Sequence, residues 1–139
     1  MSAEENQALV RRWYEEVWNA GRADLIDELV AEDFVLHHTS LPGRPVPREA
    51  YKQLLPLFRT AFPDFRITVE DMLAHGDRVA VRLRQTGTHR GEFRGIPPSG
   101  KRVDTTALAI LRFAGGRIAE AWGAERDWPA VLADARDAP

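Results

Sequence analysis

Residues 65–83 read FRITVEDMLAHGDRVAVRL, and their pattern carries the strongest fold signal in the chain. Apolar and polar side chains alternate from Phe65 to Val69 and again from Val79 to Leu83. A period of two is typical of a β-strand with one buried face. Between the two runs, His75-Gly76-Asp77-Arg78 has the composition of a tight turn, in which Gly76 can adopt positive φ. The stretch therefore predicts a β-hairpin.

The pattern continues toward the C-terminus. After a Gly- and Pro-rich loop at 91–100, one strand is expected from Arg102 to Phe113 and another from Arg117 to about Ala124, joined at Gly115-Gly116. Pro129 suits the first turn of a closing helix, where a backbone donor is not needed. The second half of the chain is thus predicted to be a meander of long antiparallel strands.

The first half has helical periodicity. Ser2 and Glu5 have the spacing of a capping box, and apolar side chains recur at helical spacing from Leu9 to Trp18. Gly21 suits the end of this helix, and Asp24 is expected to cap a short second one. These residues predict an N-terminal pair of helices.

A short strand is expected from Phe34 to His38, followed by a third helix from about Arg48 to Phe62 that Pro56 should kink or break. Helices followed by a strand meander predict an α+β fold. We expect residues 1–139 to form a single domain, in which a curved antiparallel sheet is packed by the N-terminal helices into a cone around an apolar pocket.

The amino-acid composition limits the kinds of binding partner expected for this protein. The 139 residues include no Cys, and 19 basic against 21 acidic residues give a net charge of -2. This balance does not favour nucleic-acid binding, and no apolar run is as long as a membrane span. The acidic start lacks the features of a signal peptide, so we expect a cytoplasmic protein. The expected partner is a small apolar organic molecule, or a second copy of the chain.

Five segments in order resemble one family: LVRRWYEEVWNAG at 9–21, DFVLH at 33–37, AFPDF at 61–65, GTHRGEF at 87–93 and GIPPSGK at 95–101. Together they are similar to the SnoaL-like polyketide cyclases of the nuclear transport factor two-like superfamily. The resemblance implies an α+β cone, a homodimer or higher assembly, and neither a metal nor an organic cofactor. It also implies an intramolecular aldol ring closure with an aspartate as acid and base.

The resemblance points to Asp127 as that catalytic aspartate, because it follows the Glu120-Ala121-Trp122 motif and precedes the closing helix. One extra residue separates Trp122 from it, so a rigid alignment would select Arg126 instead. A β-bulge at Gly123 or Ala124 would absorb the extra residue. The alternative is that Asp127 is the N-cap of the last helix, since Asp before Trp128-Pro129 is a good cap sequence.

Other polar residues are weaker candidates for the site. His37 and His38 alternate on one strand, so only one of them faces the pocket, and the family pattern favours His37. His89 is expected at the pocket mouth, as a second substrate-binding residue. Glu120 either faces the pocket or forms an ion pair with Arg112 on the neighbouring strand.

The remaining expected pocket residues are apolar: Trp13, Phe58, Phe62 and Trp122 are expected to form walls for a substrate, or to be ordinary core. Two hypotheses remain. In the first, the protein is a cofactor-free cyclase, or a related lyase, isomerase or dehydratase, with Asp127 as acid and base. In the second, it is a ligand-binding or assembly module without chemistry, for which apolar walls suffice.

Overall fold

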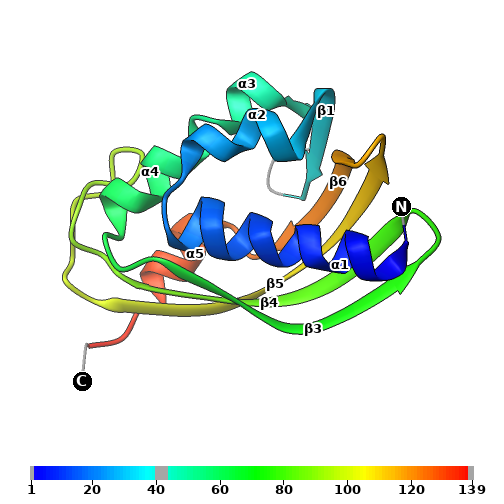
Figure 1. The fold of residues 1–139 in the computed structure, drawn as a ribbon. Coiled ribbons are helices and arrows are strands. Elements are labelled where there is room, and N and C mark those ends of the chain that lie inside the picture. Colours follow the sequence, from blue (N-terminus) through cyan, green and yellow to red (C-terminus); the bar gives the residue numbers. More distant parts are fainter. Residues whose placement is uncertain (1, 40–43, 138–139) are drawn as a thin grey trace.

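The structure is a computed structural model that describes residues 2–39 and 44–137, and it confirms the predicted α+β class with a curved, unclosed sheet (Figure 1). The helical elements are α1 (Ala3–Arg12), η1 (Trp13–Asn19), η2 (Ala23–Leu25), α2 (Ile26–Leu29), α3 (Arg48–Tyr51), α4 (Leu54–Ala61) and α5 (Trp128–Ala133). The strands are β1 (Val30–His38), β2 (Val46–Pro47), β3 (Arg66–His75), β4 (Arg78–Thr88), β5 (Arg102–Ala114) and β6 (Arg117–Glu125).

The first helix begins at the predicted capping box. The backbone N–H of Glu5 donates to Oγ of Ser2 at 3.1 Å, and the N–H of Ser2 donates to the Glu5 carboxylate at 3.2 Å. After Arg12 the helix continues as the wider π-helical turns of η1, and it ends before Gly21, which has a φ of 72°. The left-handed conformation at this end is the one that glycine adopts without strain.

The prediction that Asp24 caps the second helix is wrong. Asp24 lies inside η2, which begins one residue earlier at Ala23, and its carboxylate accepts a hydrogen bond from the Arg22 guanidinium at 2.9 Å. The apolar side chains of this segment nevertheless pack inward, because Leu25, Ile26 and Leu29 are all buried.

The single helix expected from Arg48 to Phe62 is two helices, α3 and α4. Pro56 lies in the first turn of α4, where a missing N–H leaves no helical hydrogen bond unmade. Its ring is incompatible with a continuous helix through the preceding turn, so the break falls at residues 52–53.

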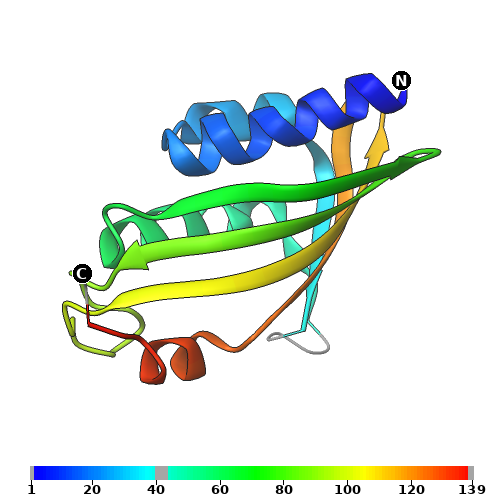
Figure 2. The same cartoon turned by 90° about the horizontal axis from the view of Figure 1, so that it is seen from below.

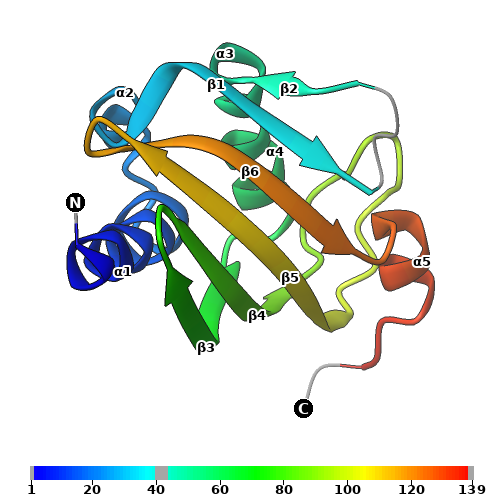
Figure 3. The same ribbon diagram turned by 90° about the vertical axis from the view of Figure 1, so that its right-hand side faces the viewer.

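The six strands form one sheet in the order β2-β1-β6-β5-β4-β3 (Figure 3). The hairpins β3–β4 and β5–β6 and the pair β4–β5 are antiparallel, as predicted. The sheet is not wholly antiparallel, because β1 pairs in parallel with β6 through His37↔Trp122 and His38↔Gly123. These two strands are far apart in the sequence, and their pairing brings the histidines beside the end of β6.

The predicted bulge at Gly123 or Ala124 is not there, because pairing with β5 is continuous through both residues to Glu125. The irregularity lies at Ala119, between the pairs Phe113↔Ile118 and Arg112↔Glu120. One extra residue at that point reverses the alternation along β6. Ile118 and Ala121 therefore face the core, whereas Glu120 faces the other side of the sheet.

Helices cover one face of the sheet and leave the opposite face uncovered (Figure 2). The hydrophobic core fills the space between the covered face and the helices. We call the two faces inner and outer. No helix in the described ranges is both long enough and apolar enough to cross a membrane.

Candidate functional site

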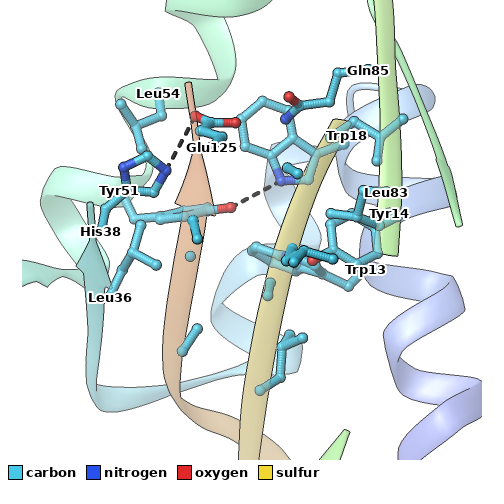
Figure 4. Close-up of a pocket in the computed structure, with 18 of the residues that line it drawn as sticks. Trp13, Tyr14, Trp18, Leu36, His38, Tyr51, Leu54, Leu83, Gln85 and Glu125 are labelled. Carbon is cyan, nitrogen blue, oxygen red and sulfur yellow. Dashed lines mark hydrogen bonds and ion pairs between the residues drawn. The ribbon is translucent and has the colours of Figure 1, made fainter. Parts of the chain in front are cut away.

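A cavity of about 120 Å³ lies within the core, between the inner face of the sheet and the helices (Figure 4). Its wall combines aliphatic side chains with seven aromatic ones: Trp13, Tyr14, Trp18, Phe34, Tyr51, Phe58 and Phe65. Its polar groups come from the two tyrosines and from His38, Gln85 and Glu125. An apolar space with a few polar groups is typical of a small-molecule site.

Three of the aromatic lining residues come from η1. The π-helical turns carry Trp13, Tyr14 and Trp18 to the cavity, and segments of this kind are frequent at functional sites. The indole N–H of Trp18 donates to Oη of Tyr51 at 3.0 Å, and the rings of Trp13 and Tyr51 are 5.4 Å apart. Tyr51 is thereby held in one orientation.

The central polar feature is a pair formed by His38 and Glu125. Nε2 of His38 lies 3.1 Å from Oε1 of Glu125, and the two side chains are only 14% and 11% exposed. His38 is the last residue of β1 and Glu125 the last of β6. The parallel pairing of these strands is what brings the two side chains together at the cavity.

A third residue fixes the carboxylate. The indole N–H of Trp128, at the start of α5, donates to Oε1 of Glu125 at 2.9 Å. Both contacts therefore fall on the same oxygen, and Oε2 has no hydrogen-bond partner among the residues that the structure describes. The result is a positioned carboxylate in the cavity wall, with both of these contacts on Oε1.

Two hydroxyl groups complete the polar lining. Burial, with a smaller contribution from the charge of Glu125, raises the pKa of Tyr14. Burial also raises the pKa of Tyr51, against the opposing effect of the hydrogen bond from Trp18. Both phenols stay protonated at physiological pH and remain hydrogen-bond donors.

The structure places Asp127 outside this cavity. Its side chain is exposed, and Oδ2 accepts a hydrogen bond from the backbone N–H of Ala130 at 3.1 Å as the N-cap of α5. Pro129 lies in the first turn of that helix. Asp127 thus has the geometry of a helix N-cap, the alternative to a catalytic role that the sequence analysis left open. Arg126 is exposed and pairs with Asp134.

His37, Glu120 and Trp122 come together on the outer face instead of in the cavity. Nε2 of His37 lies 2.7 Å from Oε2 of Glu120, and its ring stacks on Trp122 at 5.6 Å. The predicted pairing of Glu120 with Arg112 is confirmed at 3.2 Å. The hydrogen bond from His37, followed by that from Arg112, holds the pKa of Glu120 below its usual value. The reversal of alternation at Ala119 explains the outward orientation of Glu120 and Trp122. His37 faces outward because it alternates with the inward Leu36 on β1.

The other expected pocket residues divide into two groups. Trp13 and Phe58 line the cavity, whereas His89 and Phe62 do not. The ring of His89 is buried 5.5 Å from that of Phe62, and Nδ1 lies 3.4 Å from Oγ of Ser99. Its backbone also bonds to Gly100 and Lys101, so His89 anchors the loop at 91–100.

Sequence reasoning ranked His38 below His37 and did not select Glu125. The signal for His38 was the alternation Phe34, Leu36, His38, which places all three on the buried face of one strand. Glu125 continues the inner face of β6 beyond Ala121, but the predicted end of that strand at about Ala124 hid it. Nothing in the sequence shows that these two residues meet.

Comparison with known proteins gives a consistent result. A family model described as SnoaL-like polyketide cyclase matches residues 8–130. The nogalonic acid methyl ester cyclase of Streptomyces nogalater is 28% identical over 113 residues, which cover 81% of each chain. The aklanonic acid methyl ester cyclase of Streptomyces peucetius is 28% identical over 127 residues, or 89% of this chain and 83% of that one.

Solved structures share the fold. AclR of Streptomyces galilaeus, a proposed hydroxylase, superposes with a TM-score of 0.83 at 30% identity and covers 95% of this chain and 96% of its own. IdmH of Streptomyces antibioticus, a proposed polyketide cyclase, has a TM-score of 0.80 at 35% identity and covers 92% and 96%.

Proposed function

Because the chain belongs to the SnoaL-like polyketide cyclase family, we propose that it closes a carbon ring in a polyketide-type substrate by an intramolecular aldol reaction, with Glu125 as acid and base. The observation that carries this proposal is the inward carboxylate of Glu125, held on one oxygen by His38 and Trp128. The relatives named as cyclases support the reaction class.

The reaction needs only proton transfers and one new bond. Oε2 of Glu125 removes a proton from a carbon activated by neighbouring carbonyls, and the resulting enolate carbon attacks a second carbonyl carbon of the same molecule. The carbon–oxygen π electrons move onto oxygen, and the proton held by Glu125 returns to that alkoxide. Substrate and product are isomers, so no oxidant or reductant enters the step.

The cavity wall supplies stabilisation for the charge that develops. Tyr14 and Tyr51 are protonated donors, and a hydroxyl aimed at a developing oxyanion lowers the barrier in a site with little water. His38 acts through Glu125 as a positioning residue, because its contact falls on the oxygen that does not take the proton.

The volume of the cavity limits how large a part of the substrate it can hold. Its volume of about 120 Å³ is close to the roughly 150 Å³ of an engineered cavity that binds benzene. The space therefore fits one six-membered ring, the one being closed. Any further rings of a polyketide must lie outside the enclosed space.

The test is turnover of nogalonic and aklanonic acid methyl esters, the compounds after which two relatives are named, by the native chain and by two matched carboxylate variants. We expect Glu125→Gln to lower kcat/KM by about 10²- to 10⁴-fold, the usual contribution of a general base, while Asp127→Asn leaves it unchanged. Full activity in Glu125→Gln would refute the assignment, as would loss of activity in Asp127→Asn alone.

The same assay separates this function from the alternatives. A non-catalytic binding module would bind these esters without converting them. Hydroxylation, the activity proposed for AclR, would add an oxygen atom to the product, whereas aldol closure leaves the mass of the substrate unchanged. Mass spectrometry of the product therefore decides between the three.

A further inference from the structure

Gln85 is a polar residue at a position where the strand pattern predicts an apolar one. It lies on β4 two residues after Leu83, on the inner face of the sheet, and lines the cavity. Gln85 is only 8% exposed. Its Oε1 atom is buried without a hydrogen-bond partner among the described residues.

An unpaired amide in an aromatic cavity needs an explanation. A buried polar atom without a partner carries a free-energy penalty, and native proteins retain few of them. Asn6, Arg48 and His89 also have buried side-chain atoms without a hydrogen-bond partner, but none of the three lines this cavity. Among the described residues, Gln85 is thus the one place where an unmet hydrogen-bonding group and the ligand space coincide.

The sheet register places Gln85 on the inner face of β4, two residues beyond the row of paired residues that contains Glu125. Glu125 pairs with Ala107 on β5, and Ala107 in turn pairs with Leu83 on β4. Because neighbouring strands are about 4.8 Å apart, the backbones of β4 and β6 are about 10 Å apart here. Between them, β5 contributes Thr105 beside Gln85 and Ala107 beside Glu125. In Figure 4 the amide of Gln85 points toward the side of the cavity on which Glu125 lies.

We infer that the Gln85 amide binds an oxygen substituent on the substrate ring, on the side of the ring away from the carbon that Glu125 deprotonates. The inference rests on the proposed function for the role of Glu125. An amide offers both an acceptor and donors, so a hydroxyl or a carbonyl meets its requirement. The substrate class is therefore an oxygen-substituted ring, and a plain hydrocarbon ring is a poor ligand.

The test uses two one-ring probes that match the cavity, phenol and benzene, with the full chain. Their dissociation constants are measured by NMR titration for the native chain, for Gln85→Met and for Glu125→Gln. Methionine keeps the length of the side chain without the amide. Comparing the phenol-to-benzene ratio between variants cancels the different hydration of the two probes.

We expect the ratio to favour phenol in the native chain and to shift toward benzene by about tenfold in Gln85→Met, the value of one net hydrogen bond. Glu125→Gln should keep the native phenol-to-benzene ratio, since the Gln85 amide that binds the phenol hydroxyl remains. Thermal unfolding of Gln85→Met should occur at or above the native Tm, because a buried unpaired group is removed.

An unchanged ratio in Gln85→Met overturns the inference, and so does a native chain that does not bind phenol. A ratio that shifts only in Glu125→Gln would assign the oxygen site to the carboxylate instead. Binding is measured here without turnover. If the native chain selects phenol through Gln85 but converts neither ester, the proposed function is refuted and only the oxygen-binding role of Gln85 stands.

Discussion

His38 occupies the space that a side chain on Gly123 would need: an added Cβ would lie 2.9 Å from Cδ2 of His38. The two residues are paired across the parallel strands β1 and β6. Real Cβ atoms do not approach other heavy atoms this closely, so the imidazole would have to move. Glycine at this position therefore leaves room for the imidazole in the orientation that pairs with Glu125.

The first prediction follows from this contact. Gly123→Ala should displace His38 from Glu125, lower kcat by about 10- to 100-fold and destabilise the fold by about 1–3 kcal/mol. Steady-state kinetics and urea unfolding measure the two effects. In a His38→Ala background the same substitution should have little further effect, because the clash is gone. Equal effects in both backgrounds would show that the contact is not the cause.

The second prediction concerns the cap of α5. Asp127→Ala should lower the free energy of unfolding by about 1 kcal/mol, because the N–H of Ala130 loses its acceptor. Asp127→Asn should leave stability nearly unchanged, since Asn caps as well as Asp. Chemical denaturation of the three proteins checks this, and a stable Asp127→Ala would contradict the role as a cap.

The third prediction is a dependence of stability on pH. Burial opposes ionisation of Asp64, but hydrogen bonds from the N–H of Thr88 at 2.7 Å and its Oγ1 at 2.8 Å, aided by the charge of Arg102, more than offset it. The pKa of Asp64 is therefore lowered in the folded chain. Its contribution to stability is fully present above the unfolded pKa of about 3.9 and is lost as pH falls through the folded pKa.

Asp64→Asn removes this contribution. We expect it to be less stable than the native chain by about 1 kcal/mol at pH 7, since Asp64 is exposed and its hydrogen bonds are partly screened. The gap should narrow as pH falls below about 4. Urea unfolding of both proteins from pH 7 to pH 2 measures it. A gap that is constant with pH would show that the carboxylate charge plays no part.

The fourth prediction is that two copies of the chain associate through the outer face of the sheet. The strand register aligns Leu73, Ala80, Ile110, Trp122 and His37 in one row across five strands. Large apolar side chains are exposed here, with Leu73 at 70% and Ile110 at 42%. A groove of about 690 Å³ follows the row.

The neighbouring rows carry both signs of charge, Asp71 beside Arg82 on one side and Arg112 beside Glu120 on the other. A second copy related by a twofold axis can match an apolar row and oppose unlike charges, so we expect a homodimer through this face. Ile110→Asp should yield a monomer in light scattering after size exclusion. Thr106→Asp, on the same strand and face, should stay dimeric. A monomeric native chain would contradict the prediction.

Local patterns determined most of the secondary structure. The capping box at Ser2, the β3–β4 hairpin around Gly76 and the N-cap at Asp127 each depend on residues a few positions apart, and each can be identified from the sequence. The family could also be identified from the sequence, because five ordered segments carry it. These features need no knowledge of which distant strands meet.

The position of the site depended on tertiary structure. One extra residue at Ala119 in β6 decides which of its side chains face inward, and only pairing with β5 reveals it. The same pairing extends β6 to Glu125, and the parallel contact with β1 then brings His38 to it. Alternation within a strand fixes which residues share a face, but the sequence alone does not say where a bulge falls or which strand lies alongside. For that reason the sequence determined the fold and family of this protein, while long-range strand register decided that Glu125 and His38, not Asp127 and His37, line its cavity.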